Sequence, residues 1–161
     1  MTELVIVGQA PSRIGDGRPF SGPSGKRLAA LFGLRDYEQL AASMTLINIF
    51  GNSADRREVR GDHFDRDRAR QLGEELVELW RGHRGHVIVI ACGHSVFQAL
   101  TGQRGTFYQA MIFSEEASHI EVWCFPHPSG ASSYWNEVPN RLTAANFLRR
   151  ILKRSGIDMA R

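Results

Sequence analysis

Residues 4–8 read Leu4-Val5-Ile6-Val7-Gly8, an apolar and largely β-branched run that ends at a glycine. A continuous apolar run of this length is typical of a strand that is buried on both faces of a parallel sheet. Similar runs follow at residues 45–50, 87–91 and 120–125, and only the first of these contains an amide residue, Asn48. We therefore predict four strands of one central sheet from these runs.

Helical patterns separate the predicted strands. Apolar side chains recur at helical spacing in residues 24–34 and 64–83 and after Ser95, and a basic helix is predicted to end near Arg154. A shorter helix is expected at residues 37–42, Ser24 and Ser95 are expected to cap their helices, and an added strand near residues 108–113 is a candidate partner for the fourth strand. This alternation predicts an α/β fold, a three-layer αβα sandwich with a central, mostly parallel, four-stranded sheet.

Composition limits the class of protein. The chain has 161 residues, of which 42% are hydrophobic and 23% charged, the balance of a single globular domain over residues 1–161. No apolar run approaches the roughly 20 residues that cross a bilayer, and the first residues lack a signal-peptide pattern, so we expect a cytoplasmic protein without a membrane partner. The net charge of +3 permits a polyanionic partner without requiring one.

Cys92 and Cys124 each lie in an apolar run, which predicts buried thiols. Two such cysteines cannot by themselves hold a structural zinc ion or an iron–sulfur cluster. We expect no cofactor and no metal.

Two stretches resemble phosphate-binding motifs, but neither has the required residues at the required positions. Residues 22–26 resemble the end of a nucleotide-triphosphate loop, but Phe20 stands where a glycine is required and Arg27 where a Ser or Thr would bind magnesium. Pro11 occupies the position at which a dinucleotide-binding turn needs its second glycine. The glycines of this region therefore serve another purpose.

Polar, glycine or proline residues lie at the ends of three of the predicted strands. Residues 8–12 follow the first strand, Asn48 lies at the end of the second, and residues 127–130 follow the fourth. Ligands of open parallel sheets bind beside the carboxyl ends of the strands, so we expect these segments to meet in one pocket. Residues 8–25 also hold five of the sixteen glycines and three of the six prolines, which is typical of a long functional loop.

Four motifs occur in a fixed order. They are Gly8-Gln9-Ala10-Pro11, then Gly17-Arg18-Pro19-Phe20-Ser21-Gly22-Pro23-Ser24-Gly25, then Leu46-Ile47-Asn48, and finally His127-Pro128-Ser129. Together they resemble the uracil-DNA glycosylase superfamily, and most closely its family-four-like bacterial and archaeal members, over residues 4 to about 150. The resemblance implies an enzyme that hydrolyses the N-glycosidic bond of uracil or a related pyrimidine in single- or double-stranded DNA and leaves an abasic site. The polar, flexible Gln9 adds a second hypothesis, that the substrate is a 5-modified uracil.

The chain also departs from that family. It lacks the four cysteines of the family-four iron–sulfur cluster, and Ala10 stands where well-studied members place an Asp or Asn that orients the attacking water. Gln9 replaces a family-four Glu, so the usual general base is missing, a loss that typically costs about 10²–10⁴ in rate. Asp16 and Asp55 are the substitute carboxylates that the loops offer.

The resemblance and the residue chemistry together assign roles around a flipped base. Phe20 is expected to stack on it, Asn48 to bind the N3–H and O4 edge, and His127, held between two prolines, to donate to O2. Gln9, with Ala10, is expected near the C5 edge or the attacking water. The alternatives are that Phe20 anchors its loop in the core and that Asn48 bonds loop backbone.

Small polar groups near these motifs can bind phosphates without reading sequence. The predicted DNA contacts are Ser12, Ser21, Gly22, Ser24, Lys26, Ser129 and Gly130. Tyr134 or Trp135 is the candidate wedge that enters the duplex. The remaining histidines, His63, His83, His86, His94 and His119, are interpreted as surface or capping groups.

Two other functions remain open. A catalytically weak protein that binds a base or DNA is favoured by Ala10, and a nucleoside- or nucleotide-acting protein is favoured by the modest charge. The sequence carries no oligomer signal, so a monomer is expected.

Overall fold

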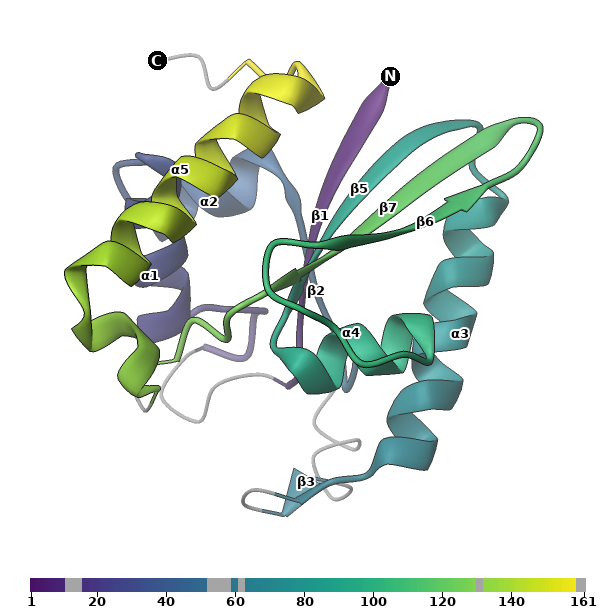
Figure 1. Cartoon of the computed structure of the whole chain (residues 1–161), viewed down its shortest axis with the longest axis horizontal. Coiled ribbons are helices and arrows are strands. Elements are labelled where there is room, and N and C mark those ends of the chain that lie inside the picture. The colour runs from purple at the N-terminus through teal and green to yellow at the C-terminus, as the bar shows by residue number, and fades with distance from the viewer. Residues whose placement is uncertain (11–15, 52–58, 61–62, 130–131, 159–161) are drawn as a thin grey trace.

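The computed structural model describes residues 1–10, 16–51, 59–60, 63–129 and 132–158 (Figure 1). They form an α/β fold around a mixed, mostly parallel sheet with strand order β2-β1-β5-β7-β6. Its strands are β1 (Thr2–Gly8), β2 (Thr45–Asn48), β5 (Gly85–Cys92), β6 (Ala110–Ser114) and β7 (Ser118–Phe125). A separate two-stranded ribbon pairs β3 (Val59–Arg60) with β4 (His63–Phe64).

The sheet has five strands, one more than predicted. The four predicted strands are the parallel ones, and β6 adds to β7 in the antiparallel direction at the edge. An edge strand is buried on one face only, and Ile112 in β6 is 49% exposed. The apolar run of β6, Ala110-Met111-Ile112-Phe113, is short, and no residue of the strand is fully buried.

Helices cover both faces of the sheet. The helices are α1 (Pro23–Phe32), α2 (Tyr37–Ser43), α3 (Arg66–Arg81), α4 (His94–Thr101) and α5 (Val138–Ser155), with a 3-10 turn at Ser133–Asn136. In Figure 1, α1, α2 and α5 lie on one face and α3 and α4 on the other. Successive strand residues face opposite sides, so Leu4 and Ile6 join the α1/α5 core and Val5 and Val7 the α3/α4 core.

The two cysteines are buried and free, as predicted. Cys92 lies in the α1/α5 core and Cys124 in the α3/α4 core. Burial raises the pKa of Cys124 to about 11 and that of Cys92 further. Both thiols are therefore protonated at neutral pH.

The predicted helix caps are wrong in detail. Gly22 and Gly93, rather than Ser24 and Ser95, precede the first residues of α1 and α4, and neither cap uses a side chain. Pro23 suits the first helical position, which starts α1 early, and Gly93 has a φ of 101°, which favours glycine.

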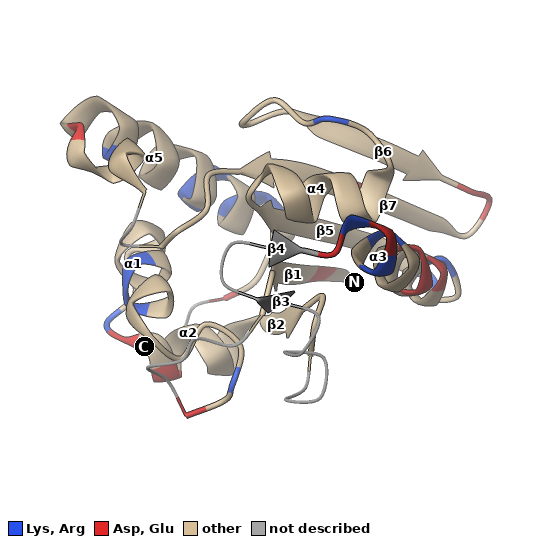
Figure 2. Cartoon of the chain, turned by 90° about the horizontal axis from the view of Figure 1, so that it is seen from below, with Lys and Arg blue, Asp and Glu red and all other residues tan. Residues whose placement is uncertain are grey.

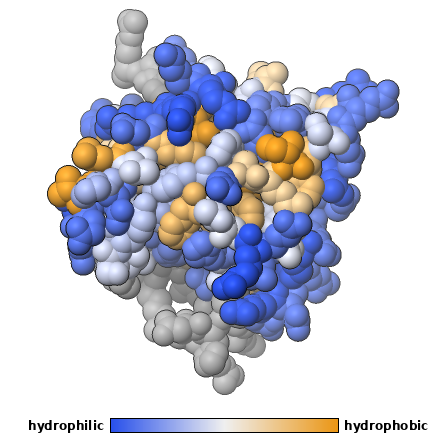
Figure 3. All heavy atoms as spheres, viewed as in Figure 1, coloured by the Kyte–Doolittle hydropathy of each residue, from blue (hydrophilic) through white to orange (hydrophobic). Residues whose placement is uncertain are grey.

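The surface of the described residues carries scattered apolar side chains. Large exposed examples are Met1, Leu79, Ile112, Val138 and Leu142. On the face seen in Figure 3 the apolar patches are small and bordered by hydrophilic surface. In the described part of the chain, no helix combines the length and apolarity that crossing a membrane requires.

Candidate active site

Four strand ends form a row at the carboxyl edge of the sheet. Asn48 is paired with Gly8, Cys92 with Phe125, and β1 with β5 between them. Because neighbouring strands lie about 4.8 Å apart, the row from Asn48 to Phe125 is about 15 Å wide. The loops that carry the sequence motifs leave the sheet along this row.

Gly8 brings two of the predicted base-binding residues together. A Cβ atom on Gly8 would lie 2.6 Å from Asn48 Oδ1 and 2.6 Å from Phe20 Cζ. Both side chains therefore close over the Gly8 backbone, and only glycine leaves room for them. The sequence motifs at residues 8, 20 and 48 meet at one point of the edge.

Phe20 is held in an unusual backbone conformation. Its φ is 59°, a left-handed value that costs a bulky residue about 1–2 kcal/mol. Two contacts hold the turn: the Tyr37 hydroxyl donates to Pro19 O at 2.6 Å, and Gly25 packs so closely that a Cβ there would lie 1.8 Å from Phe20 O. Strain of this kind concentrates at functional sites. The ring is only 7% exposed, so Phe20 also fills the core under α1.

One polar atom of the Asn48 side chain has no hydrogen-bond partner among the described residues. The side chain is 5% exposed, and Nδ2 is buried without a hydrogen-bond partner among the described residues. Nearly all buried polar groups are paired, because an unpaired one costs about 1–3 kcal/mol. This donor is available to an acceptor atom of a ligand.

His127 lies against the end of β5, one strand away from β1. The Cβ position of Gly93 is 3.5 Å from both Cβ and Cδ2 of the half-buried His127. The backbone N–H of Ser129 donates to His127 Nδ1 at 3.1 Å, so the neutral ring carries its proton on Nε2. Burial lowers the pKa of His127, which keeps the ring neutral at pH 7 and leaves Nε2–H as its donor.

Two residues outside the motifs position the His127 turn. Trp135 Nε1 donates to His127 O at 2.8 Å, and Arg27 Nη1 donates to Ser129 O at 2.9 Å. The Arg27 guanidinium also stacks 5.3 Å from the Trp135 ring centroid. Trp135 is 2% exposed, so it is an anchor and not a free wedge. No local sequence pattern predicts the Arg27 contact, because Arg27 lies 101 residues before Pro128.

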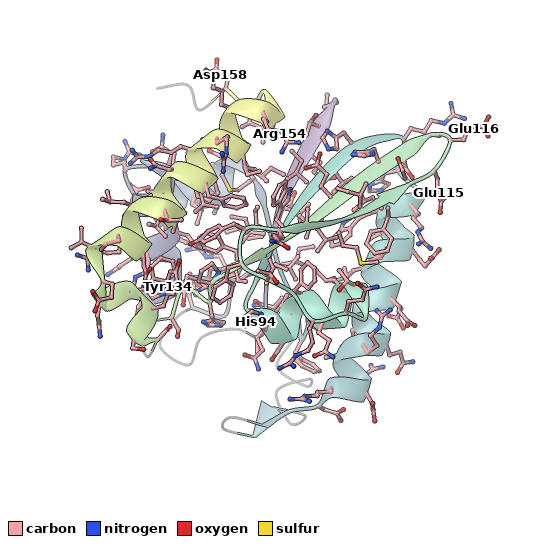
Figure 4. All side chains as sticks on the ribbon, viewed as in Figure 1. His94, Glu115, Glu116, Tyr134, Arg154 and Asp158 are labelled. Atoms are coloured by element: carbon pink, nitrogen blue, oxygen red, sulfur yellow. The ribbon has the colours of Figure 1, made fainter. Side chains whose placement is uncertain are left out.

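Tyr134, the other candidate wedge, is half-buried, and its hydroxyl lies 2.6 Å from that of Tyr108. Figure 4 shows Tyr134 near the start of α5 and His94 at the start of α4, toward the same end of the molecule as the strand ends.

Gln9 and Ala10 are half-buried immediately after β1. Their loop continues the pairing with the chain after β2, because Ile49 N–H donates to Gly8 O at 2.9 Å and Phe50 N–H to Gln9 O at 3.0 Å. The backbone around Gln9 is thereby fixed, but neither Gln9 nor Ala10 supplies a carboxylate.

The substitute carboxylates do not complete the site. Asp16 is exposed, and its carboxylate accepts hydrogen bonds from the Arg18 backbone N–H at 3.0 Å and from Arg18 Nε at 2.7 Å. Those bonds hold the pKa of Asp16 below its ordinary value, which makes it a weaker base. Asp55 lies outside the described residues.

The predicted DNA contacts lie in varied settings. Ser21 Oγ accepts the Asp16 N–H at 3.1 Å, Gly22 is the N-cap of α1, and Ser24 and Lys26 lie in the first turn of α1, half-buried and exposed respectively. Both backbone polar groups of Ser129 hold the His127 turn. Ser12 and Gly130 fall outside the described residues.

Three histidines are more than the surface or capping groups predicted. His94 stacks on Phe107 with ring centroids 4.4 Å apart, and its Nδ1 lies 3.7 Å from Cys124 Sγ. His86 and His119 gather around Glu121 near the amino-terminal ends of β5 and β7. The sequence does not reveal these contacts, because the partner residues are distant along the chain.

Comparison with known proteins gives one clear result. No curated protein matches the chain at a significant level. The family model described as the uracil DNA glycosylase superfamily matches residues 1–154, which include all four sequence motifs and every strand of the central sheet. The chain belongs to the uracil DNA glycosylase superfamily.

Proposed function

We propose that this protein is a monofunctional DNA glycosylase that hydrolyses the N-glycosidic bond of uracil, or of a 5-modified uracil, in DNA and leaves an abasic site. The observation that carries the proposal is the buried, unpartnered Nδ2 of Asn48 beside Phe20, at the edge where His127 presents Nε2–H. Superfamily membership supports the same reaction class.

Base recognition follows from the chemistry of the Asn48 amide. Its Nδ2 donates to O4 of a uracil ring and its Oδ1 accepts the N3–H, whereas cytosine presents the opposite pattern on that edge. Phe20 stacks on the ring, a contact worth about 1–3 kcal/mol. These contacts offset the few kcal/mol that extruding a nucleotide costs.

Bond cleavage places charge where His127 can stabilise it. As C1′–N1 breaks, its electron pair stays with the base and negative charge grows on O2. A positioned donor at that oxygen contributes about 10²–10³ in rate, and the neutral His127 Nε2–H is that donor. A water held by Gln9 bonds to C1′ through its oxygen and releases its proton to solvent. Without a carboxylate base the reaction is slower by about 10²–10⁴.

Gln9 extends the substrate range in this proposal. Its side chain is polar, flexible and half-buried, and it lies beside Gly8 at the end of β1. A small polar group at C5 of the base can be accommodated there, where a bulky aromatic residue would exclude it. Uracil and 5-hydroxymethyluracil are therefore the substrates to compare.

Charge favours a DNA partner on the same side of the fold. Figure 2 shows Lys and Arg on α1, which contains no Asp or Glu, whereas α3 carries both signs. α1 also begins directly after the Phe20 turn. A positive surface beside the pocket attracts the phosphate backbone, and this attraction falls steeply with salt.

The second candidate is a base- or DNA-binding protein with little catalytic activity. Ala10 favours it, because alanine cannot orient an attacking water. Both functions use the same Phe20, Asn48 and His127 pocket, so they differ only in turnover.

The test is an incision assay on oligonucleotides that carry uracil or 5-hydroxymethyluracil opposite the same partner, single- and double-stranded, followed by alkaline cleavage of abasic sites. We expect strand breaks with the wild type and a loss of about 10²–10³ with His127→Ala. His83→Ala, at an exposed histidine outside the site, should retain full activity. Inactivity on both bases with DNA binding preserved would favour the second candidate, and salt-insensitive binding of nucleosides alone would contradict both.

A further inference from the structure

Three potential metal ligands share one face of β5 and β7 at their amino-terminal ends. His86 is directly paired with His119 across the two strands, and Glu121 follows His119 by two residues. Side chains of paired residues and of residues two apart project from the same face of a sheet. The strand register therefore brings the two imidazoles and the carboxylate together.

The distances are close to those of a metal site. Glu121 Oε1 lies 2.9 Å from His86 Nε2 and 3.7 Å from His119 Nε2, and all three ligand atoms lie within 4.8 Å of one another. Ligand atoms of a tetrahedral zinc site with bonds of about 2.0–2.1 Å are about 3.3 Å apart. The two imidazoles are partly exposed, so small rotations of their rings can close the remaining gap.

Neighbouring groups orient the ligands. Ser114 Oγ, from β6, lies 2.9 Å from His119 Nδ1, which directs His119 Nε2 toward Glu121. Trp123 Nε1 donates to Glu121 Oε2 at 2.9 Å, so Oε1 is the oxygen that faces the histidines. Hydrogen bonds to the far atoms of ligating histidines and carboxylates are the usual support of protein metal sites.

We propose that His86, His119 and Glu121 form a binding site for a late first-row divalent cation, with Zn²⁺ as the representative ion. Two imidazoles and one carboxylate are a donor set that suits zinc and its neighbours better than magnesium or calcium, which prefer oxygen ligands alone. Three protein ligands leave at least one position for water. The proposal departs from our sequence-based expectation of no metal, which considered only cysteine ligands.

Arg154 regulates access to this site. Its Nη2 lies 2.7 Å from Glu121 Oε1 and 2.9 Å from Oε2. The guanidinium is therefore hydrogen-bonded to the carboxylate at the position where a cation would bind. Arg154 is 43% exposed in the last turn of α5, so solvent lies on its open side, and a cation at Glu121 has to displace it (Figure 4). Its positive charge opposes metal binding and sets the affinity.

The site lies far from the candidate active site. His119 precedes Phe125 by six residues of β7, which corresponds to about 20 Å at the rise of a strand. Figure 4 likewise shows Arg154 toward the opposite end of the molecule from His94 and Tyr134. A cation here stabilises the fold and takes no part in base excision, so its test is independent of the proposed function.

The test is titration of the metal-free full chain with Zn²⁺ by calorimetry, with Co²⁺ absorption as a reporter of coordination geometry. We expect one ion per chain, at least about a tenfold loss of affinity in His119→Ala and in His86→Ala, and a raised melting temperature of the wild type with Zn²⁺. His83→Ala is the matched control, because His83 lies near the same sheet edge but outside the triad, and its affinity should equal that of the wild type.

The variant Arg154→Gln distinguishes a metal site from a purely structural ion-pair network. Removal of the guanidinium should tighten Zn²⁺ binding, because a competing cation leaves Glu121 Oε1. Absence of Zn²⁺ binding at 100 µM in both the wild type and Arg154→Gln would overturn the proposal, as would binding that survives the double substitution of His86 and His119. Circular dichroism of each variant establishes that it is folded.

Discussion

Glu121, at the amino-terminal edge of the parallel sheet, and Asn48, at its carboxyl edge, differ in how their polar atoms are satisfied, although Ser118 Oγ at the amino-terminal edge is also buried without a partner among the described residues. At the amino-terminal edge, the buried Glu121 accepts hydrogen bonds from His86, Trp123 and Arg154. Burial raises the pKa of Glu121, but the bonds from Trp123 and Arg154 outweigh it and hold the pKa below its ordinary value. At the carboxyl edge, Asn48 buries a donor without a partner in the described chain.

The difference separates stability from function. A satisfied buried network contributes to folding, whereas an unsatisfied donor costs stability until a ligand completes it. The strained φ of Phe20 adds a second cost at the carboxyl edge. Substitutions at the two edges should therefore have opposite signatures in activity and stability, and the following experiments test that contrast.

Among the substitutions that compare the two edges, Asn48→Leu should have the largest effect, and on activity alone. It removes two hydrogen bonds to the base at about 1.5 kcal/mol each, which corresponds to about a 10²-fold loss of uracil excision. Stability should be unchanged or higher, because the unpaired buried donor is lost while the branching and the number of non-hydrogen side-chain atoms are kept. Incision rates and urea unfolding measure the two effects.

Asn146→Leu, at an exposed position of α5, is the control for the added apolar side chain and should leave both quantities unchanged. A marked loss of stability in Asn48→Leu would show that the amide is a structural group of the loop, which is the alternative that the sequence left open.

Gly8→Ala should affect both properties. The new Cβ would lie 2.6 Å from Asn48 Oδ1 and from Phe20 Cζ, so one of them must move. Overpacking of this kind costs about 1–3 kcal/mol, and displacement of either side chain lowers excision. Gly82→Ala is the matched control, since its Cβ meets Leu79 O at an ordinary 3.4 Å. Full activity in Gly8→Ala would show that neither displaced side chain contacts the base.

Much of this edge could be predicted from sequence, and its limits have a physical cause. The apolar runs identified the four parallel strands, and the motifs at Gly8, Phe20 and Asn48 meet because parallel strands end at one edge. The apolar run of the edge strand β6, Ala110-Met111-Ile112-Phe113, is short and predicts it only as a candidate, and the structure leaves this strand partly exposed. Strand patterns depend on burial, so exposed strands are the hardest to predict.

Contacts that join distant segments could not be predicted. Arg27 and Trp135 hold the His127 turn from two different helical elements, and no local pattern encodes either contact. The His86, His119 and Glu121 group depends on strand register, which short runs do not determine. The sequence motifs therefore predict the candidate base-binding side chains more readily than the residues that support them.

Glu121→Gln tests the amino-terminal edge and should change stability alone. Charge-assisted bonds from Arg154 become neutral ones, which lowers the free energy of unfolding by about 1 kcal/mol, a small value because Arg154 is 43% exposed. Urea unfolding of metal-free protein measures it, and uracil incision should equal that of the wild type. Glu116→Gln, in the exposed turn before β7, is the control and should be neutral. An incision defect in Glu121→Gln would break the proposed separation of the two edges.

The smallest expected effect is the pH dependence of stability at His127. Burial lowers the pKa of His127 from its ordinary value of 6.5, so as the pH falls through 6.5 the unfolded chain binds a proton that the folded chain does not. The free energy of unfolding should therefore decline below pH 6.5 until the folded ring also protonates. His127→Gln should lose this part of the decline, and the control His83→Ala should retain it. Urea unfolding between pH 5 and pH 8, with NMR titration of the imidazole, measures both. Protonation at Nδ1 would remove the acceptor of the Ser129 N–H, so a ring that titrates at or above 6.5 would contradict the burial and the hydrogen bond that keep the folded ring neutral.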